Sequence, residues 1–514
     1  MHRRSLLLLL ALVAVQATAA DYSIVPVLET RQAKVTVDLG DSGTSNEFRL
    51  PAWAPGDYQI LDFGKNVASI TFYKAGEEVP STQGDDRNLW TIPDGADKVV
   101  YFIKESLGNF GAKLRVTPDE MFVSGAGVFG WFKGHMNEQQ VLHLSPEGMP
   151  VAIALPSLPD HPNDYVAKDY DQLADSPFAV SRNLKVKAFM AGGKQHYVAA
   201  FNDPGDVDLD AYASVCTKAV ESTKAIFGEL PYKEYWFLFD FGGPGGGLEH
   251  SNCCKIGLHT GTSAEEARGI IFHEYFHCFN VKRIRPAVLG PFDYTKPAVT
   301  GALWWLEGVT DYYAEILQVR SGLISRSTFL TTMTRIFNGF HRGTAYTRVT
   351  ANESSTRVWE APRSQGYGFS YYTKGKLIGM ALDLAIRANS RNTRSLDDVI
   401  RELYKETLDK PGFAEGRIRD LCVEYGGPET GRVYDVCVNQ AVRIPLEAML
   451  DPVGMGMPNG AIVDLPNAPQ TASDLGSKYP YPVGNRYASS NTTTPRREVP
   501  SSMSWYASLI WSSE

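Results

Sequence analysis

Apolar and polar residues alternate along much of the first 200 residues. Val35 and Val37 are separated and flanked by polar residues, the period-two pattern of half-buried strands. Residues 99–103 and 197–201 are apolar runs of the length of a strand. This pattern predicts a β-sandwich-like N-terminal domain over residues 21–200.

The apolar spacing becomes helical after residue 200. Residues 208–227 carry apolar side chains at helical spacing, and residues 235–241 form an aromatic strand that runs into six residues rich in glycine. Ser263, followed by Glu266 three positions later, is a capping-box signature at the start of another helix. The chain is therefore predicted to be α+β, with helices dominating from about residue 262 to residue 450.

The two ends of the chain differ from the rest. Arg3 and Arg4 precede the apolar run 6–15, and small residues follow at positions 17–19, as in a secretory signal peptide over residues 1–20. A membrane anchor is the alternative, but the run is shorter than the roughly 20 positions that a spanning helix needs. We therefore expect export, to the periplasm or as a secreted protein.

At the other end, residues 454–514 are rich in Pro, Ser, Thr, Asn and Gly. They lack a long periodic segment that could bury a core. We expect this segment to be a disordered tail.

Composition narrows the class of protein. The 514 residues are 43% hydrophobic and 21% charged, which excludes a disordered chain and a multi-span membrane protein. The formal charge is −8, and the sequence has no Lys/Arg cluster that would indicate a nucleic-acid partner. Six cysteines are compatible with export, and the neighbouring Cys422 and Cys437 are the pair that we expect to form a disulfide.

Residues 273–277 (HEYFH) form an HExxH motif. Positions i and i+4 share a helix face, so His273 and His277 can bind one metal ion. Glu274 lies one residue beyond the first ligand, where it can take a proton from an attacking water. The alternative is a helix with two histidines in the core, but burying two imidazoles and a carboxylate in this apolar segment requires compensation. A zinc ion provides that compensation.

A catalytic zinc needs a third protein ligand. Glu307 follows the second histidine by 30 residues, which leaves room for a loop and a returning helix. Asp311 is one helical turn further and can accept the second N–H of His273. The alternative for Glu307 is a surface carboxylate, but the preceding residues 304–306 (WWL) favour burial.

Several separate motifs, in order, resemble the M61 glycyl aminopeptidase family of the gluzincin metallopeptidases. They are residues 50–58 (LPAWAPGDY), 170–177 (YDQLADSP), 246–250 (GGLEH), 273–286 (HEYFHCFNVKRIRP), 307–313 (EGVTDYY) and 371–375 (YYTKG). The resemblance implies an N-terminal β-domain, a thermolysin-like zinc catalytic domain over residues 201–325 and a helical C-terminal lobe over residues 326–453. Family members commonly continue into a PDZ domain, and the remaining tail is too short and too polar for a complete one.

The resemblance also assigns a role to Tyr372. In related gluzincin aminopeptidases this tyrosine donates a hydrogen bond to the oxyanion that forms as water attacks. The alternative is an amphipathic aromatic residue at a helix end, since apolar residues follow from Leu377 with helical spacing.

Glu249 is the candidate residue for binding a peptide N-terminus. Gly247 ends a backbone-permissive glycine run, and an extended segment after it places neighbours on alternate faces, so Glu249 and His250 cannot both face the cleft. A cleft that binds an ammonium group needs an anion, and related aminopeptidases use a Glu in a comparable strand. The alternative is an exposed charge on an edge strand.

These observations predict an exported aminopeptidase with one Zn²⁺ per chain and peptides as substrates. The family name implies a preference for small N-terminal residues such as Gly or Ala. A zinc endopeptidase with the same site and a non-catalytic exported peptide-binding module remain as alternatives, and the oligomeric state is left open.

Overall fold

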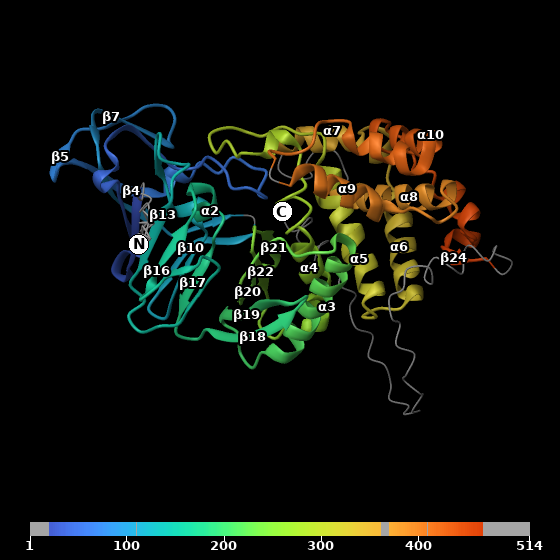
Figure 1. The fold of residues 1–514 in the computed structure, drawn as a ribbon, viewed down its shortest axis with the longest axis horizontal. Coiled ribbons are helices and arrows are strands. Elements are labelled where there is room, and N and C mark those ends of the chain that lie inside the picture. The colour runs from blue at the N-terminus through green and yellow to red at the C-terminus, as the bar shows by residue number, and fades with distance from the viewer. Residues whose placement is uncertain (1–19, 109, 361–369, 409, 466–514) are drawn as a thin grey trace, which may run out of the picture.

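The computed structural model describes residues 20–108, 110–360, 370–408 and 410–465 (Figure 1). The predicted signal peptide lies outside the described residues apart from Ala20, which begins strand β1. Residues 466–514 of the predicted tail also lie outside them.

The first part of the described chain forms three sheets, drawn in blue and cyan in Figure 1. Their strand orders are β15-β16-β13-β1-β2-β8-β4-β5, β14-β17-β11-β10-β9 and β12-β3-β7-β6. In β2, Ala33, Val35 and Val37 are buried while their neighbours are not, so the period-two pattern correctly predicted a half-buried strand. The predicted α+β multidomain fold with an N-terminal β-domain is confirmed.

The elements of this N-terminal domain have the following bounds: β1 (Ala20–Val27), β2 (Gln32–Asp38), β3 (Ser45–Arg49), β4 (Val67–Lys74), β5 (Glu77–Val79), β6 (Thr82–Gln83), β7 (Leu89–Ala96), β8 (Lys98–Lys104), β9 (Ser106–Gly108), β10 (Gly111–Thr117), β11 (Glu120–Val123), α1 (Gly125–Val128), β12 (Trp131–Phe132), β13 (Gln140–Leu144), β14 (Val151–Ile153), β15 (Ser157–Leu158), β16 (His161–Ala167), α2 (Tyr170–Ala174) and β17 (Phe178–Ser181).

A fourth sheet lies at the centre of the molecule, in the order β18-β19-β20-β22-β21. Its strands are β18 (Lys185–Ala191), β19 (Lys194–Asn202), β20 (Glu234–Phe241), β21 (Gly246–Glu249) and β22 (Cys253–Leu258). The pairs β19/β20 and β20/β22 are parallel. Since β18 and most of β19 precede residue 201, this sheet begins earlier than the predicted domain boundary.

The central sheet is buried on both faces. Ala199, Phe201 and Leu238 pack against the five-stranded sheet of the N-terminal domain, whereas Phe237 and Phe239 belong to the core shared with the helices. Helices α3 (Leu209–Phe227) and α4 (Ala264–Phe276) cover this second face. A largely parallel sheet that is buried on both faces is expected to carry apolar residues at consecutive positions along its strands.

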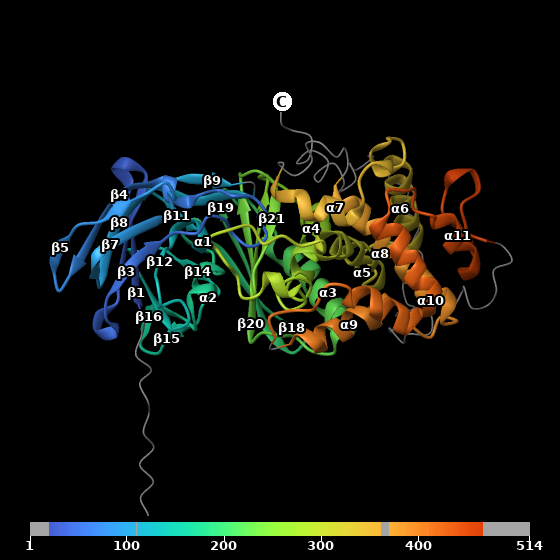
Figure 2. The ribbon, with the colours of Figure 1, turned by 90° about the horizontal axis from the view of Figure 1, so that it is seen from above.

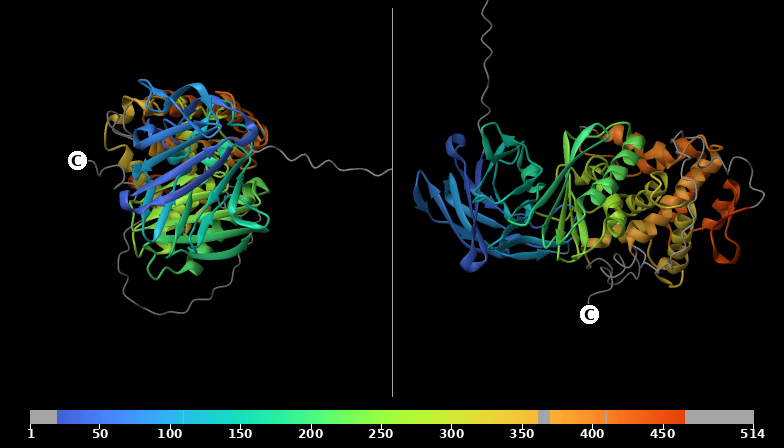
Figure 3. Two further views of the ribbon diagram at one scale, coloured as in Figure 1. Left: turned by 90° about the vertical axis from the view of Figure 1, so that its left-hand side faces the viewer. Right: turned by 90° about the horizontal axis from the view of Figure 1, so that it is seen from below.

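Further helices complete the molecule beyond the central sheet, as Figures 2 and 3 show from several sides. They are the π-helical turn η5 (Trp304–Val309), α5 (Thr310–Arg320), α6 (Arg326–Phe340), α7 (Ala351–Thr356), α8 (Tyr371–Asn389), α9 (Leu396–Thr407), α10 (Arg417–Asn439) and α11 (Leu446–Leu450). In the described part of the chain, none of the helices combines the length and the apolar character needed to cross a bilayer.

The predicted disulfide between Cys422 and Cys437 is wrong. Both residues lie on α10, one before and one after a break at Gly427, and both are buried as free thiols. Closeness in sequence did not bring the two sulfur atoms together, because each arm of the broken helix packs into the core on its own. A buried free cysteine then behaves as a small apolar residue.

The beginning of the predicted tail is structured. Met455–Gly456 (β23) pairs with Val463–Asp464 (β24), and Met455 and Ile462 are buried in the core. Arg326 of α6 forms an ion pair of 2.7 Å with Asp464. A few apolar residues at irregular spacing therefore fix residues 454–465, although they form no periodic pattern in the sequence.

Candidate functional site

Helix α4 positions the two histidines of the HExxH motif. Ser263 caps its first turn, and the side chain of Glu266 completes the predicted capping box. The helix ends at Phe276, but His277 retains helical dihedral angles, so that the i, i+4 relation with His273 is kept. Nδ1 of His273 donates to Asp311 at 2.9 Å, and Nδ1 of His277 donates to the backbone oxygen of Asn280 at 2.7 Å. Both Nε2 atoms are therefore left as electron-pair donors, and they lie 2.9 Å apart.

Glu307 approaches the same point from the turn η5. Its Oε2 lies 3.2 Å from Nε2 of His277 and 3.6 Å from Nε2 of His273. The sequence predicts a regular helix here, whereas the chain makes a π-helical turn that continues into α5. Isolated π turns are common at functional sites.

Asn280 is a residue that the sequence analysis missed. Its side-chain amide donates to the backbone oxygens of Trp305, at 3.1 Å, and Leu306, at 3.3 Å, within the π-helical turn. Its backbone oxygen accepts the hydrogen bond from His277. Asn280 therefore links the second histidine to the turn that carries Glu307.

Two glycines bring α8 against the same turn. A Cβ atom at Gly308 would lie 2.4 Å from Cα of Gly375, and one at Gly375 would lie 2.1 Å from the backbone oxygen of Trp304. Only residues without a Cβ allow the two backbones to approach this closely. The glycines of the EGVTDYY and YYTKG segments therefore have a packing role that the sequence analysis did not identify.

His273, His277 and Glu307 fit a zinc ion. For bond lengths of about 2.0–2.1 Å, ligand atoms at the corners of a tetrahedron lie about 3.3–3.4 Å apart, close to the three separations observed. All three side chains are buried. Burial opposes a positive charge at His273, but the carboxylates of Asp311 and Glu307 favour one there, so the site attracts a cation, whether a proton or a metal ion on Nε2. Two imidazoles and one carboxylate are a known donor set of catalytic zinc.

Glu274 lies directly beside this cluster. Its Oε2 is buried without a hydrogen-bond partner in the described residues. Burial, assisted by the charges of Glu249 and Glu307, raises the pKa of Glu274 to about 7 against the effect of the histidines. Gly247 lets strand β21 pass close by, since a Cβ there would lie 2.3 Å from the Glu274 carboxyl carbon.

Glu249 faces the same cluster. Its carboxylate, that of Glu274 and a ring nitrogen of His277 have atoms within 4.8 Å of one another. Glu249 is only 4% exposed, which excludes the alternative of an exposed edge-strand charge. His250 instead bonds to Asp175, through Nδ1 at 2.9 Å.

Tyr372 stands in the first turn of α8, where its backbone N–H donates to the capping Ser370 at 3.1 Å. Its ring centre lies 6.0 Å from that of His273, with the two planes inclined by 28°. The structure therefore brings together all of the site residues named in the sequence analysis, from α4, η5, α5, α8 and β21.

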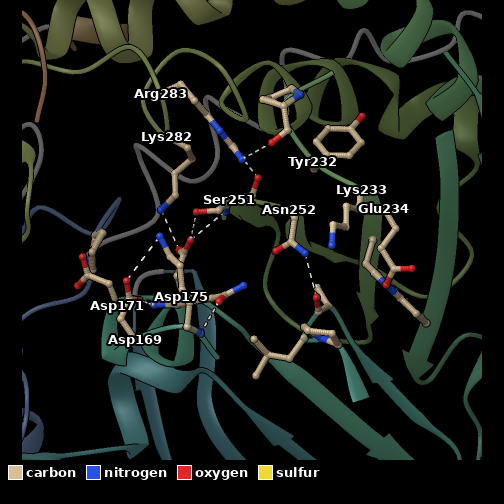
Figure 4. A pocket seen from close by; sticks show the side chains of 18 of the residues that line it. Asp169, Asp171, Asp175, Tyr232, Lys233, Glu234, Ser251, Asn252, Lys282 and Arg283 are labelled. Atoms are coloured by element: carbon tan, nitrogen blue, oxygen red, sulfur yellow. Dashed lines mark hydrogen bonds and ion pairs between the residues drawn. The ribbon is translucent and has the colours of Figure 1, made fainter. Parts of the chain in front are cut away.

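Asp175, at the end of α2, connects the N-terminal domain to this site and was not identified from the sequence. Its carboxylate accepts hydrogen bonds from Lys282 at 2.8 Å, His250 at 2.9 Å and both the backbone and the hydroxyl of Ser251 at 2.9 and 2.6 Å. Burial opposes its charge, but Lys282 and His250 hold the pKa of Asp175 well below its usual range. Figure 4 shows Lys282 and Ser251 converging on Asp175 at the edge of a cavity of about 1140 Å³.

Two models of peptidase families match the chain. The family model of the M61 glycyl aminopeptidase matches residues 266–378, and that of the peptidase M61 N-terminal domain matches residues 22–182. The comparison with curated proteins gave no match.

Three solved structures illustrate the likeness in fold. An aminopeptidase N family protein from Idiomarina loihiensis is 25% identical, with a TM-score of 0.79 over 85% of this chain and 78% of that one. An M1 zinc metallopeptidase from Deinococcus radiodurans is 13% identical, with a TM-score of 0.54 over 84% and 95% of the two chains. Native yeast LTA4 hydrolase is 12% identical, with a TM-score of 0.52 over 85% and 70%. The last two show a shared fold.

Proposed function

The chain belongs to the M61 glycyl aminopeptidase family, and on that premise we propose that it is an exported aminopeptidase that removes small N-terminal residues from peptides with one zinc ion per chain. The observation that carries this proposal is the position of Glu249. A buried carboxylate within 4.8 Å of both Glu274 and His277 gives the ammonium group of a peptide an anion beside the reacting centre.

The metal ligands in this proposal are Nε2 of His273, Nε2 of His277 and Glu307. When bound there, zinc polarises the scissile carbonyl and makes water a better nucleophile. Asp311 holds the ring of His273 in the orientation that leaves Nε2 free for the metal.

The proton transfers fall to Glu274. Burial raises the pKa of Glu274 above its ordinary value, which favours its accepting a proton from water and returning it to the leaving amine. Its unbonded Oε2 is available for that proton. Tyr372 donates a hydrogen bond to the oxyanion that develops on the former carbonyl oxygen.

Export is proposed from the sequence of residues 1–20. The basic pair, the apolar run and the small residues at 17–19 form the pattern that secretory signal peptides share. The preference for Gly or Ala is proposed from the family to which the chain belongs.

The test is hydrolysis of glycyl and alanyl dipeptide amides, free and N-acetylated, with and without a metal chelator. We expect hydrolysis of the free substrates alone, its loss with chelator and its recovery on adding zinc. Comparable cleavage of the acetylated substrates would indicate an endopeptidase instead. Binding without cleavage by the zinc-loaded protein would indicate a peptide-binding module.

A further inference from the structure

A tight turn of the N-terminal domain touches the proposed ammonium-binding residue. Gly56, at the tip of the turn formed by residues 54–57, has a φ of +87°, which favours glycine. A Cβ atom at this position would lie 2.9 Å from both carboxylate oxygens of Glu249 and 2.5 Å from Cδ1 of Leu248. The backbone of the turn therefore packs directly against the Glu249 side chain.

The turn is firmly held in this position. Asp57 N donates to the backbone oxygen of Ala54 at 2.9 Å, and the carboxylate of Asp57 lies 3.4 Å from Nζ of Lys113, with both side chains buried. Just before the turn, Trp53 Nε1 donates to the backbone oxygen of Asp293 at 2.9 Å. These contacts tie residues 53–57 both to their own domain and to the segment that follows helix α4.

Tyr58 follows the turn and lies near the carboxylates of the same site. It is 5% exposed, and its ring meets that of Trp359 edge-to-face at 6.0 Å. Burial, followed by the charges of Glu307 and Glu249, raises the pKa of Tyr58 well above its usual range, so the phenol is neutral and close to both carboxylates. Among the described residues its hydroxyl has no hydrogen-bond partner, and the hydroxyl is not one of the fully buried polar atoms. A tyrosine hydroxyl at such a site can take its partner from a bound ligand.

We propose that Tyr58 is a substrate-binding residue that the N-terminal domain supplies to the zinc cleft, where its hydroxyl oxygen accepts a hydrogen bond from the substrate's N-terminal ammonium group beside Glu249. This inference rests on the proposed aminopeptidase function. An ammonium group has three donors, and a neutral oxygen can accept one of them without adding another negative charge to the cluster. The turn of residues 54–57 packs against Glu249, so its backbone occupies space directly beside the carboxylate that would bind the ammonium group.

The test measures binding of alaninamide and N-acetylalaninamide by calorimetry, so that binding is read without turnover. The zinc-loaded Glu274→Gln protein serves as the background, with and without Tyr58→Phe. This change removes one oxygen and keeps the ring in contact with Trp359. We expect Tyr58→Phe to weaken alaninamide binding by about tenfold or more, the range for a hydrogen bond to a charged group, and to leave the weak binding of N-acetylalaninamide unchanged.

The matched control is Tyr165→Phe. Tyr165 is another buried tyrosine, on β16, and it packs in the core of the N-terminal domain, so this substitution should leave alaninamide binding unchanged. One outcome would overturn only the role of Tyr58. In it, the Tyr58→Phe and background proteins bind alaninamide with equal affinity, and both still prefer alaninamide to N-acetylalaninamide. Equal affinity of the background protein for both amides would overturn the proposed aminopeptidase function as well.

Discussion

Replacing Asp175 by asparagine should destabilise the folded protein by about 3–5 kcal/mol, the range for breaking a buried ion pair by removing one partner. The side chain of Lys282 is 3% exposed, and its Nζ lies 2.8 Å from the Asp175 carboxylate. Asparagine can still offer a neutral oxygen, but the buried ammonium group of Lys282 then loses its anionic partner, with the ring of Phe292 5.7 Å away. Ser251 also loses a charged acceptor for its N–H and its hydroxyl.

The assay is thermal and denaturant unfolding of Asp175→Asn and wild type at pH 7. The matched control is Asp119→Asn, which removes an ion pair of 2.8 Å with Arg182 whose side chains are 60% and 64% exposed. Exposed pairs contribute about 0–1 kcal/mol, so the control should unfold almost as the wild type does. A loss in Asp175→Asn no larger than that of the control would refute the assignment of Asp175 as a largely buried link between domains.

The effect of pH has a definite sign. The folded protein lowers the pKa of Asp175, so this carboxylate stabilises the fold above its unfolded pKa of about 3.9, and that contribution is lost as the pH falls through the lower folded value. The difference in stability between wild type and Asp175→Asn should therefore persist from pH 7 to about pH 4 and narrow only at more acidic pH.

Three further substitutions test separate parts of the site. Tyr372→Phe should lower kcat by about a hundredfold or more with little change in KM or zinc content, as expected for loss of an oxyanion donor, and an unchanged kcat would exclude that role. Glu249→Ala should lower kcat/KM for free dipeptide amides by about tenfold to a hundredfold and weaken the discrimination against N-acetylated substrates, whereas full retention of that discrimination would remove Glu249 as the anchor. Asp311→Asn should weaken zinc binding by about tenfold to a hundredfold in a chelator competition, and equal zinc affinity would show that Asp311 does not orient His273.

Short-range sequence patterns correctly predicted the elements whose formation depends on residues close together in the chain. The alternation around Val35 and Val37 identified β2, and the capping box at Ser263 identified the start of α4. The helical repeat of the HExxH motif then placed the Nε2 atoms of His273 and His277 together, as the structure shows.

The features that sequence reasoning missed depend on contacts between distant segments. The parallel pairing of β19 with β20 joins strands more than 30 residues apart, and no local pattern predicts it. Asn280 binds a turn about 25 residues away in sequence, and Asp175 binds Lys282 across 107 residues. The predicted pairing of Cys422 with Cys437 failed for the same reason, since their separation in the fold is set by the break in α10.

The measurement that tests the central claim most directly compares bound zinc and turnover in wild type, His273→Ala and Glu274→Gln. His273 is a proposed ligand, so its loss should remove both zinc and activity. Glu274 is a proposed base and not a ligand, so Glu274→Gln should keep one zinc ion per chain and lose about two to four orders of magnitude in kcat on alanyl dipeptide amides. Wild-type turnover in Glu274→Gln, or full activity of His273→Ala without zinc, would contradict the account.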